Sequence, residues 1–168
     1  MEAKRRGLDY LAVHDHPYQR RFVDAFVLIG MIAARTERIG VFPDVANLPL
    51  RPPTVPAKTA TSLDVLSGGR FELGLGAGGF WDAIAGYGGL RRAPGQALAA
   101  LAEAIEVIRA VWSGQRSLRV DGRFYRLAGV QLRAAAGPSG RHLAGGARAP
   151  CAAAGRPGGR PVGALTPR

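Results

Sequence analysis

Short runs of apolar residues alternate with longer helical patterns along the first three quarters of the chain. The runs LDYLAV (8–13), RIGVFPDV (38–45) and RFELGLG (70–76) each have the length of a buried strand. They recur about every 30 residues, the length of a strand–helix–strand unit. This order predicts a parallel sheet that is covered by helices.

Helical patterns fill the segments 22–36, 54–67 and 96–112. The first is apolar nearly all round, which is typical of a well-covered helix. The second ends at Gly68-Gly69, a helix-terminating signal. In the third, we expect one face of large side chains to be buried, made of Leu98, Leu101, Ile105, Ile108 and Trp112.

A hairpin is predicted after the last helix. The segment SLRVDGRFYRL (117–127) alternates around Asp121-Gly122, a common two-residue turn. A closed (β/α)8 barrel needs about 250 residues, whereas this chain has 168. The pattern therefore predicts an α/β fold and leaves two architectures open, a doubly wound sheet or an incomplete barrel.

The composition changes after Leu127. Residues 128–168 contain six arginines but no lysine, aspartate or glutamate, and they carry six of the formal net charge of +11. Alanine, glycine, proline and arginine fill 31 of these 41 positions, and no aromatic residue is present. Such a segment can bury little surface. We therefore divide the chain into a domain over 1–127 and a disordered low-complexity tail over 128–168.

The net positive charge leaves a nucleic-acid-binding protein open as an alternative. The tail that holds much of this charge has no aromatic groups that could stack on bases, which weakens that interpretation. The only cysteine, Cys151, excludes an internal disulfide. Because no apolar leader and no membrane-spanning run is visible, we expect a cytoplasmic protein with no membrane partner.

Unusual residues follow each predicted strand. His14-Asp15-His16 follows the first, DVANLPLRPP (44–53) includes the end of the second, and GLGAGG (74–79) ends the third. Because α/β folds place their sites at the carboxyl ends of strands, we expect a site there. No cluster of further carboxylates or histidines supports a metal site.

GLGAGG also matches the G-x-G-x-x-G fingerprint of dinucleotide-binding domains. A small NAD-binding doubly wound domain is therefore a second alternative. Two features weaken it: the following FWDAIAGYGG does not predict a helix opening, and no strand ending in an acidic residue follows at the required distance.

Four further stretches are informative when taken together: GLDYLAVHDHPY (7–18), ARTERIGVFPDVANLPLRPP (34–53), AKTATSLDVLSGGRFELGLGAGGFWDAI (57–84) and AIEVIRAVWSG (104–114). They resemble the luciferase-like monooxygenase family, whose members are flavin- or deazaflavin-dependent oxidoreductases on a TIM barrel. The resemblance implies a partial TIM barrel with parallel strands two to four and their helices, followed by the predicted hairpin and disordered tail. It also implies FMN or coenzyme F-420 (deazaflavin) as cofactor, a small-molecule substrate and the homo-oligomers often found in the family, and we expect no specific nucleic acid as partner.

The resemblance also assigns site residues. His16 takes the place of the family's active-site histidine, and an imidazole can donate or accept a proton near neutral pH. A non-prolyl cis peptide that backs the isoalloxazine would join Asp44 to Val45. The residues expected to bind the cofactor are Asp15, Asp44, Val45, Asn47, Gly76, Ala77 and Gly78, and no metal is expected.

Two family segments are missing from the pattern. The chain starts inside the family's first helix, without the first strand, and it has GRHLAGGARAPC where a fifth strand resembling GIWLGARGPR would follow. If residues 141–145, RHLAG, are written in GC-rich codons, a one-base shift allows them to be read as GIWLG, and the residues that follow are compatible with the same shift. We therefore hypothesise a reading-frame shift between about Ala128 and Gly140. On this hypothesis the chain is an incomplete fragment that is poorly stable and inactive.

Overall fold

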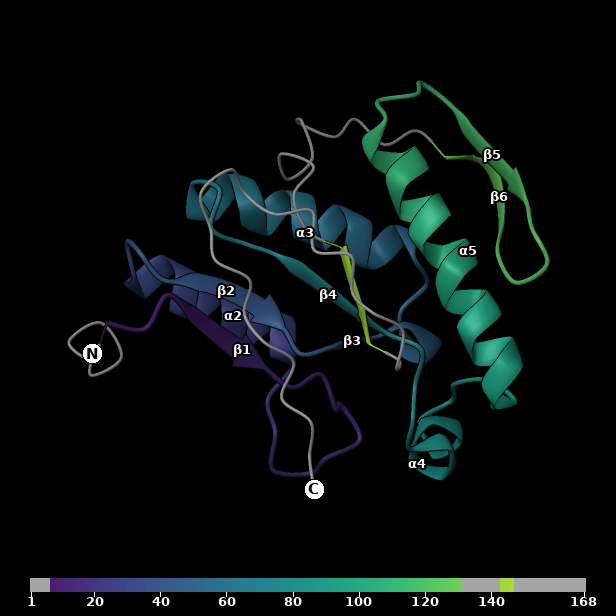
Figure 1. Ribbon diagram of the computed structural model, residues 1–168, viewed down its shortest axis with the longest axis horizontal. Helices are drawn as coiled ribbons and strands as arrows, with labels where there is room; N and C mark the ends of the chain where they lie inside the picture. The colour runs from purple at the N-terminus through teal and green to yellow at the C-terminus, as the bar shows by residue number, and fades with distance from the viewer. Residues whose placement is uncertain (1–6, 131–142, 147–168) are drawn as a thin grey trace.

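A computed structural model describes residues 7–130 and 143–146 of the chain, and the three predicted strands pair in parallel, as the pattern predicts (Figure 1). A parallel bridge between Val41 and Phe71 joins the second predicted strand to the start of the third. The described residues form an α/β fold without a closed barrel. The parallel pairs are β1 (Tyr10–Val13) with β2 (Gly40–Pro43), β3 (Ala46–Asn47) with β4 (Leu73–Gly76), and β4 with β7 (Leu143–Gly146).

The predicted strand 38–45 is shorter in the structure, where it forms β2 over residues 40–43. A further short strand, β3, follows Asp44 and Val45. The peptide bond between Asp44 and Val45, which lie between the two strands, is cis. β2 pairs with β1, whereas β3 pairs with β4.

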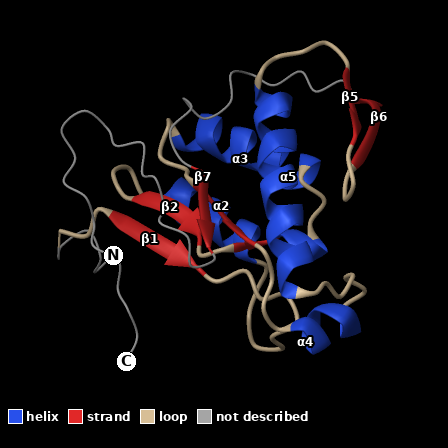
Figure 2. Cartoon of the chain, turned by 45° about the vertical axis from the view of Figure 1, so that its right-hand side comes forward, coloured by secondary structure: helices blue, strands red, loops and turns tan. Residues whose placement is uncertain are grey.

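Helices cover the strands, as the periodicity predicts. α2 packs against β2 and α3, and α3 packs against α5. The hairpin formed by β5 and β6 is antiparallel, as expected, and lies beside α5 on the side away from the parallel strands (Figure 2). The predicted two-residue turn at Asp121-Gly122 is wrong, because Asp121 pairs with Arg126 and the turn spans residues 122–125. The elements are α2 (Ala25–Arg35), η1 (Leu48–Leu50), α3 (Thr54–Ser67), α4 (Trp81–Gly86), α5 (Pro94–Trp112), β5 (Leu118–Asp121) and β6 (Arg126–Val130).

Local signals set several helix ends. The Asp24 carboxylate accepts hydrogen bonds from the first free N–H groups of α2, those of Phe26 (2.9 Å) and Val27 (3.1 Å). α3 ends at Gly68, whose φ of 69° is left-handed, so the predicted terminating signal is confirmed. The prediction that no helix opens after GLGAGG is wrong, because the short helix α4 begins at Trp81.

The buried face of α5 agrees with the prediction at Leu101 and Ile108 but not at Leu98. Leu98 is 51% exposed, whereas small residues such as Ala100 and Ala104 are almost fully buried. Alanine has no bulk beyond Cβ, so this face can approach α3 closely, and the Trp112 indole N–H donates to the carbonyl oxygen of Ala57 at 3.1 Å. The buried face consists of Ala97, Ala100, Leu101, Ala104, Val107, Ile108 and Val111.

Arg70 ties the helices together at the amino-terminal end of β4. Its guanidinium donates to the carbonyl oxygens of Ala33, Ile39 and Ser67 at 2.7–3.0 Å and to the Thr36 hydroxyl at 3.1 Å. Carbonyls at helix ends lack partners within the helix. Arg70 therefore supports the fold at the rim opposite the carboxyl ends of the strands.

The tail is not disordered where the structure describes it. β6 continues through the expected boundary after Leu127, and residues 143–146 form β7, which pairs with β4. The prediction of disorder is wrong for these residues because each group has a strand to pair with: Ala128 and Val130 pair with β5, and residues 143–146 pair with the edge of β4. The rest of the tail lies outside the described residues, and the frame-shift hypothesis stays a prediction.

Candidate active site

The carboxyl ends of the parallel strands meet at one rim, as predicted. Val13 at the end of β1 is in register with Pro43, and the backbone N–H of Asp44 donates to the Val13 carbonyl at 2.8 Å. Asn47 at the end of β3 is in register with Gly76 at the end of β4. The three segments singled out in the sequence therefore come together on one side of the sheet.

Four aromatic rings line this rim. The imidazole of His16 stacks on two other rings. Its centroid lies 5.6 Å from that of the His14 ring and 5.4 Å from that of the Tyr18 ring. The Phe80 ring, which follows β4, meets His16 edge-on at 5.4 Å. His14 donates from Nδ1 to the carbonyl oxygen of Asp44 at 2.9 Å. The loop after β1 is thus held against the segments that follow β2 and β4.

Glycines allow the backbones to approach closely at this rim. A Cβ at Gly76 would overlap Cγ2 of Val45. Gly78 has a φ of +98°, which side chains rarely allow, and a Cβ there would come within 2.8 Å of Pro49. The backbone from Gly76 to Gly78 therefore lies close to Val45, between β2 and β3, and to Pro49, which follows β3. Gly78 is itself exposed, whereas Gly76 is buried.

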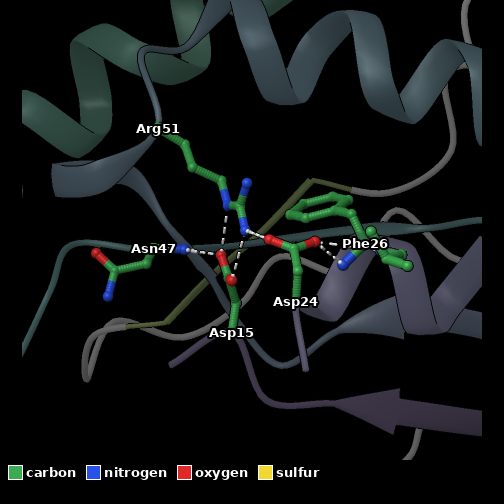
Figure 3. Close-up of polar contacts among 6 residues, drawn as sticks. Asp15, Asp24, Phe26, Asn47 and Arg51 are labelled. Atoms are coloured by element: carbon green, nitrogen blue, oxygen red, sulfur yellow. Dashed lines mark hydrogen bonds and ion pairs between the residues drawn. The ribbon is translucent and has the colours of Figure 1, made fainter. Parts of the chain in front are cut away.

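A buried ion-pair cluster lies beneath the rim (Figure 3). The Arg51 guanidinium donates to both oxygens of the Asp15 carboxylate, each at 2.9 Å, and to Oδ2 of Asp24 at 2.6 Å. The backbone N–H of Asn47 also donates to Asp15, at 2.9 Å. Figure 3 shows the guanidinium between the two carboxylates, beside the Phe26 ring, whose centroid is 4.7 Å from Cζ. Asp15 is only 1% exposed, so its charge is compensated inside the protein.

Charges within this cluster shift several pKa values. The hydrogen bond to Asp15 raises the pKa of Arg51, despite burial, so the guanidinium stays charged. Burial raises the pKa of Asp24, but the hydrogen bonds from Arg51 and from the start of α2 outweigh it and leave that pKa lowered. Burial, together with the charge of Asp15, raises the pKa of the Tyr18 phenol, which therefore keeps its proton at neutral pH.

The Asn47 side chain carries a buried acceptor without a partner. Its Oδ1 makes no hydrogen bond to any described residue, and Asn47 as a whole is 6% exposed. Buried polar atoms usually have a partner, and a lone one is a mark of strain, of a bound group or of water. Figure 3 shows the carboxamide turned away from Asp15, which is bound by the backbone N–H of Asn47.

The structure brings most of the predicted site residues together at the rim, but it places Asp15 in the ion-pair cluster. His16, Asp44, Val45, Asn47 and the segment 76–78 all lie at the rim, although Ala77 is buried. Asp15 lies below it, engaged with Arg51. Contact of these residues with a cofactor stays a prediction.

Sequence reasoning missed Arg51, Asp24, Tyr18 and Phe80. One signal could have pointed to Arg51: Asp15 closely follows a strand that was predicted to be buried, and a buried carboxylate needs a cationic partner.

Within the part of the chain that the structure describes, no three histidine, cysteine, aspartate or glutamate side chains are grouped so that they could hold a metal ion. No helix in those residues has the length and apolar character needed to cross a membrane.

Known relatives share both sequence and fold with this chain. It is 36% identical over 137 residues to an F420-dependent glucose-6-phosphate dehydrogenase of Nocardia farcinica, covering 77% of this chain and 40% of the relative. It is 30% identical over 130 residues to a 5,10-methylenetetrahydromethanopterin reductase of Archaeoglobus fulgidus, covering 77% and 37%. The chain thus spans about 40% of the length of these relatives.

A solved structure shows the same arrangement of elements. The oxygenating constituent of 3,6-diketocamphane monooxygenase from Pseudomonas putida, in complex with FMN, superposes with a TM-score of 0.73 at 22% identity, over 86% of this chain and 42% of that one. The family model of luciferase-like monooxygenases matches residues 2–162. This match, with the parallel strands and the rim described above, shows that the chain belongs to the luciferase-like monooxygenase family.

Proposed function

We propose that the rim formed by β1, β3 and β4 holds the ring of FMN or coenzyme F-420 in an oxidoreductase that acts on a small molecule. The observation that carries this proposal is the convergence of His16, Asn47 and Gly76 at the carboxyl ends of parallel strands. We also propose that β1, β2 with β3, and β4 correspond to strands two to four of a TIM barrel. The parallel order and the similarity to the family support both proposals.

The residues at the rim fit a flat polar ring. Asn47 offers a buried Oδ1 that lacks a partner among the described residues, and a ring N–H group could donate to it. Gly76 and Gly78 keep the backbone free of side chains where a ring would lie close. Asp44 and Val45 would back the ring from the neighbouring segment. When bound, the cofactor supplies hydride or oxygen transfer to the substrate.

His16 is the candidate catalytic residue, and its task is to hold or move a proton beside the reacting atoms. Its ring is half-buried, and stacking on Tyr18 and Phe80 restricts its orientation. A general acid or base must be placed within hydrogen-bond reach of the proton that it transfers. The exposed edge of this ring cluster faces solvent, from which a small substrate can enter.

Coenzyme F-420 is the cofactor that we propose first, with FMN as the alternative. Relatives whose names state F420 dependence are 34–36% identical to this chain. FMN is present in the more distant solved structure, which is 22% identical. The reaction class that we propose is oxidoreduction of a small-molecule substrate.

Titration of the purified chain with F-420 and with FMN, followed by cofactor fluorescence, tests the proposal. We expect saturable binding that Asn47→Leu and His16→Ala weaken, whereas Glu106→Gln, a change on the exposed surface of α5, leaves it unchanged. NAD and duplex DNA serve as competing ligands. Binding of NAD alone would favour a dinucleotide-binding domain, and salt-sensitive retention of DNA alone would favour a nucleic-acid-binding protein.

A further inference from the structure

We infer that Arg51 is a positioning residue that sets His16 and Asn47 in place through a single buried carboxylate, that of Asp15. The inference rests on the proposed function of the rim and adds a residue that touches none of the reacting atoms. It starts from one observation: the guanidinium binds Asp15 and Asp24, which lie at the two ends of the loop between β1 and α2.

The loop from Asp15 to Asp24 is closed by these bonds. Arg51 donates to Asp15 at one end and to Asp24 at the other, and Asp24 in turn caps the first turn of α2. His16 and Tyr18 lie inside the closed loop. Closing a loop restricts the conformations of the residues within it, so the bonds of Arg51 limit where the His16 ring can lie.

The same carboxylate also orients Asn47. Oδ2 of Asp15 accepts one bond from Nε of Arg51 and one from the backbone N–H of Asn47, both at 2.9 Å. His16, the candidate proton-transfer residue, therefore follows Asp15 directly in the chain, and Asn47, the candidate contact to the cofactor ring, is hydrogen-bonded to the Asp15 carboxylate through its backbone N–H. A displacement of Asp15 would move His16 and Asn47 together.

An arginine is required by the geometry of this cluster. A planar guanidinium presents several N–H groups in a fixed fork, which matches two carboxylates at once, whereas the lysine ammonium is a point charge. The side chain of Arg51 is 19% exposed, and its plane lies beside the Phe26 ring. A lysine at this position would keep the charge but lose the bidentate bond to Asp15.

Arg70 offers a matched control for a purely structural effect. It is also an arginine with several hydrogen bonds, but these tie α2 and α3 together at the opposite rim. Arg70→Lys should lower the stability of the fold without a direct effect on the loop after β1. A positioning role of Arg51 predicts a local effect that Arg70→Lys does not reproduce.

Backbone amide exchange of the full chain, without any cofactor, provides the first measurement. In Arg51→Lys we expect exchange of the Asn47 N–H and of residues 15–24 to rise about tenfold or more, while α5 is unchanged. In Arg70→Lys these residues should keep their protection. Equal exchange in the two variants, or unchanged protection of Asn47 in Arg51→Lys, would overturn the inference.

Cofactor affinity provides the second measurement. With the unfolded fraction accounted for, we expect Arg51→Lys to weaken binding of F-420 or FMN about tenfold and Arg70→Lys to change it less than about twofold. Equal affinities of the two variants would contradict the inference. If the unaltered chain binds neither cofactor, the proposed function fails, and amide exchange alone decides whether Arg51 organises the rim.

Discussion

Burial should make the ion pair between Arg51 and Asp15 far more important for stability than the exposed pair between Arg91 and Asp82. Nε of Arg51 lies 2.9 Å from Oδ2 of Asp15, and these side chains are 19% and 1% exposed. Nη2 of Arg91 lies 2.6 Å from Asp82, and these side chains are 61% and 94% exposed.

Replacing Arg51 by methionine leaves the Asp15 carboxylate buried, with the Asn47 N–H as its only hydrogen-bond partner among the described residues. Removing one member of a buried pair costs about 3–5 kcal/mol of unfolding free energy because the remaining charge is uncompensated. Removing one member of an exposed pair changes stability by about 0–1 kcal/mol, since water and salt screen the remaining charge. Arg91→Met is therefore the control.

Urea unfolding at pH 7, followed by circular dichroism, measures these differences. The double variant Asp15→Asn/Arg51→Met should be more stable than Arg51→Met alone, because a neutral amide is cheaper to bury than an unpaired carboxylate. The reasoning is refuted if Arg51→Met costs no more than Arg91→Met, or if adding Asp15→Asn restores nothing.

Three further predictions concern the rim, the hairpin and pH. Gly76→Ala should cost about 1–3 kcal/mol because its Cβ would overlap Val45, and Gly79→Ala, where a Cβ meets nothing within 4 Å, is the control in the same urea assay. Glu103 accepts hydrogen bonds from two backbone N–H groups of the β5–β6 turn at 2.7–3.0 Å, so Glu103→Gln should speed amide exchange in the turn but not in the parallel strands. Asp24 has a pKa below its ordinary value of 3.8. The stability that ionised Asp24 contributes is complete above its unfolded pKa and is lost as pH falls through its lower pKa in the folded protein. Asp24→Asn should therefore flatten the acid side of a plot of unfolding free energy against pH. An unchanged profile would contradict this.

Much of the architecture follows from local patterns in the sequence. Apolar runs and helical periodicity placed β1, β4, α2, α3 and the hairpin near their observed positions, because side-chain period depends on residues close together in the chain. The residues at the rim could also be proposed from the sequence, because the carboxyl ends of parallel strands lie at the same edge of a sheet. Local patterns predicted the buried face of α5 less well, because alanines pack against α3 only in the assembled fold.

The division of the polar residues between the rim and the core was decided only by tertiary structure. Asp15 binds Arg51, 36 residues further along the chain, and Arg51 also binds Asp24, 27 residues before it. No periodicity records such pairings, because they arise when separate strand ends are brought together. By itself, the sequence determined which segments form strands and helices and that unusual residues follow three of the strands. Tertiary structure decided that Asp15 lies in a buried ion pair beneath the rim while His16, its neighbour in the chain, stacks on the aromatic rings that line the rim.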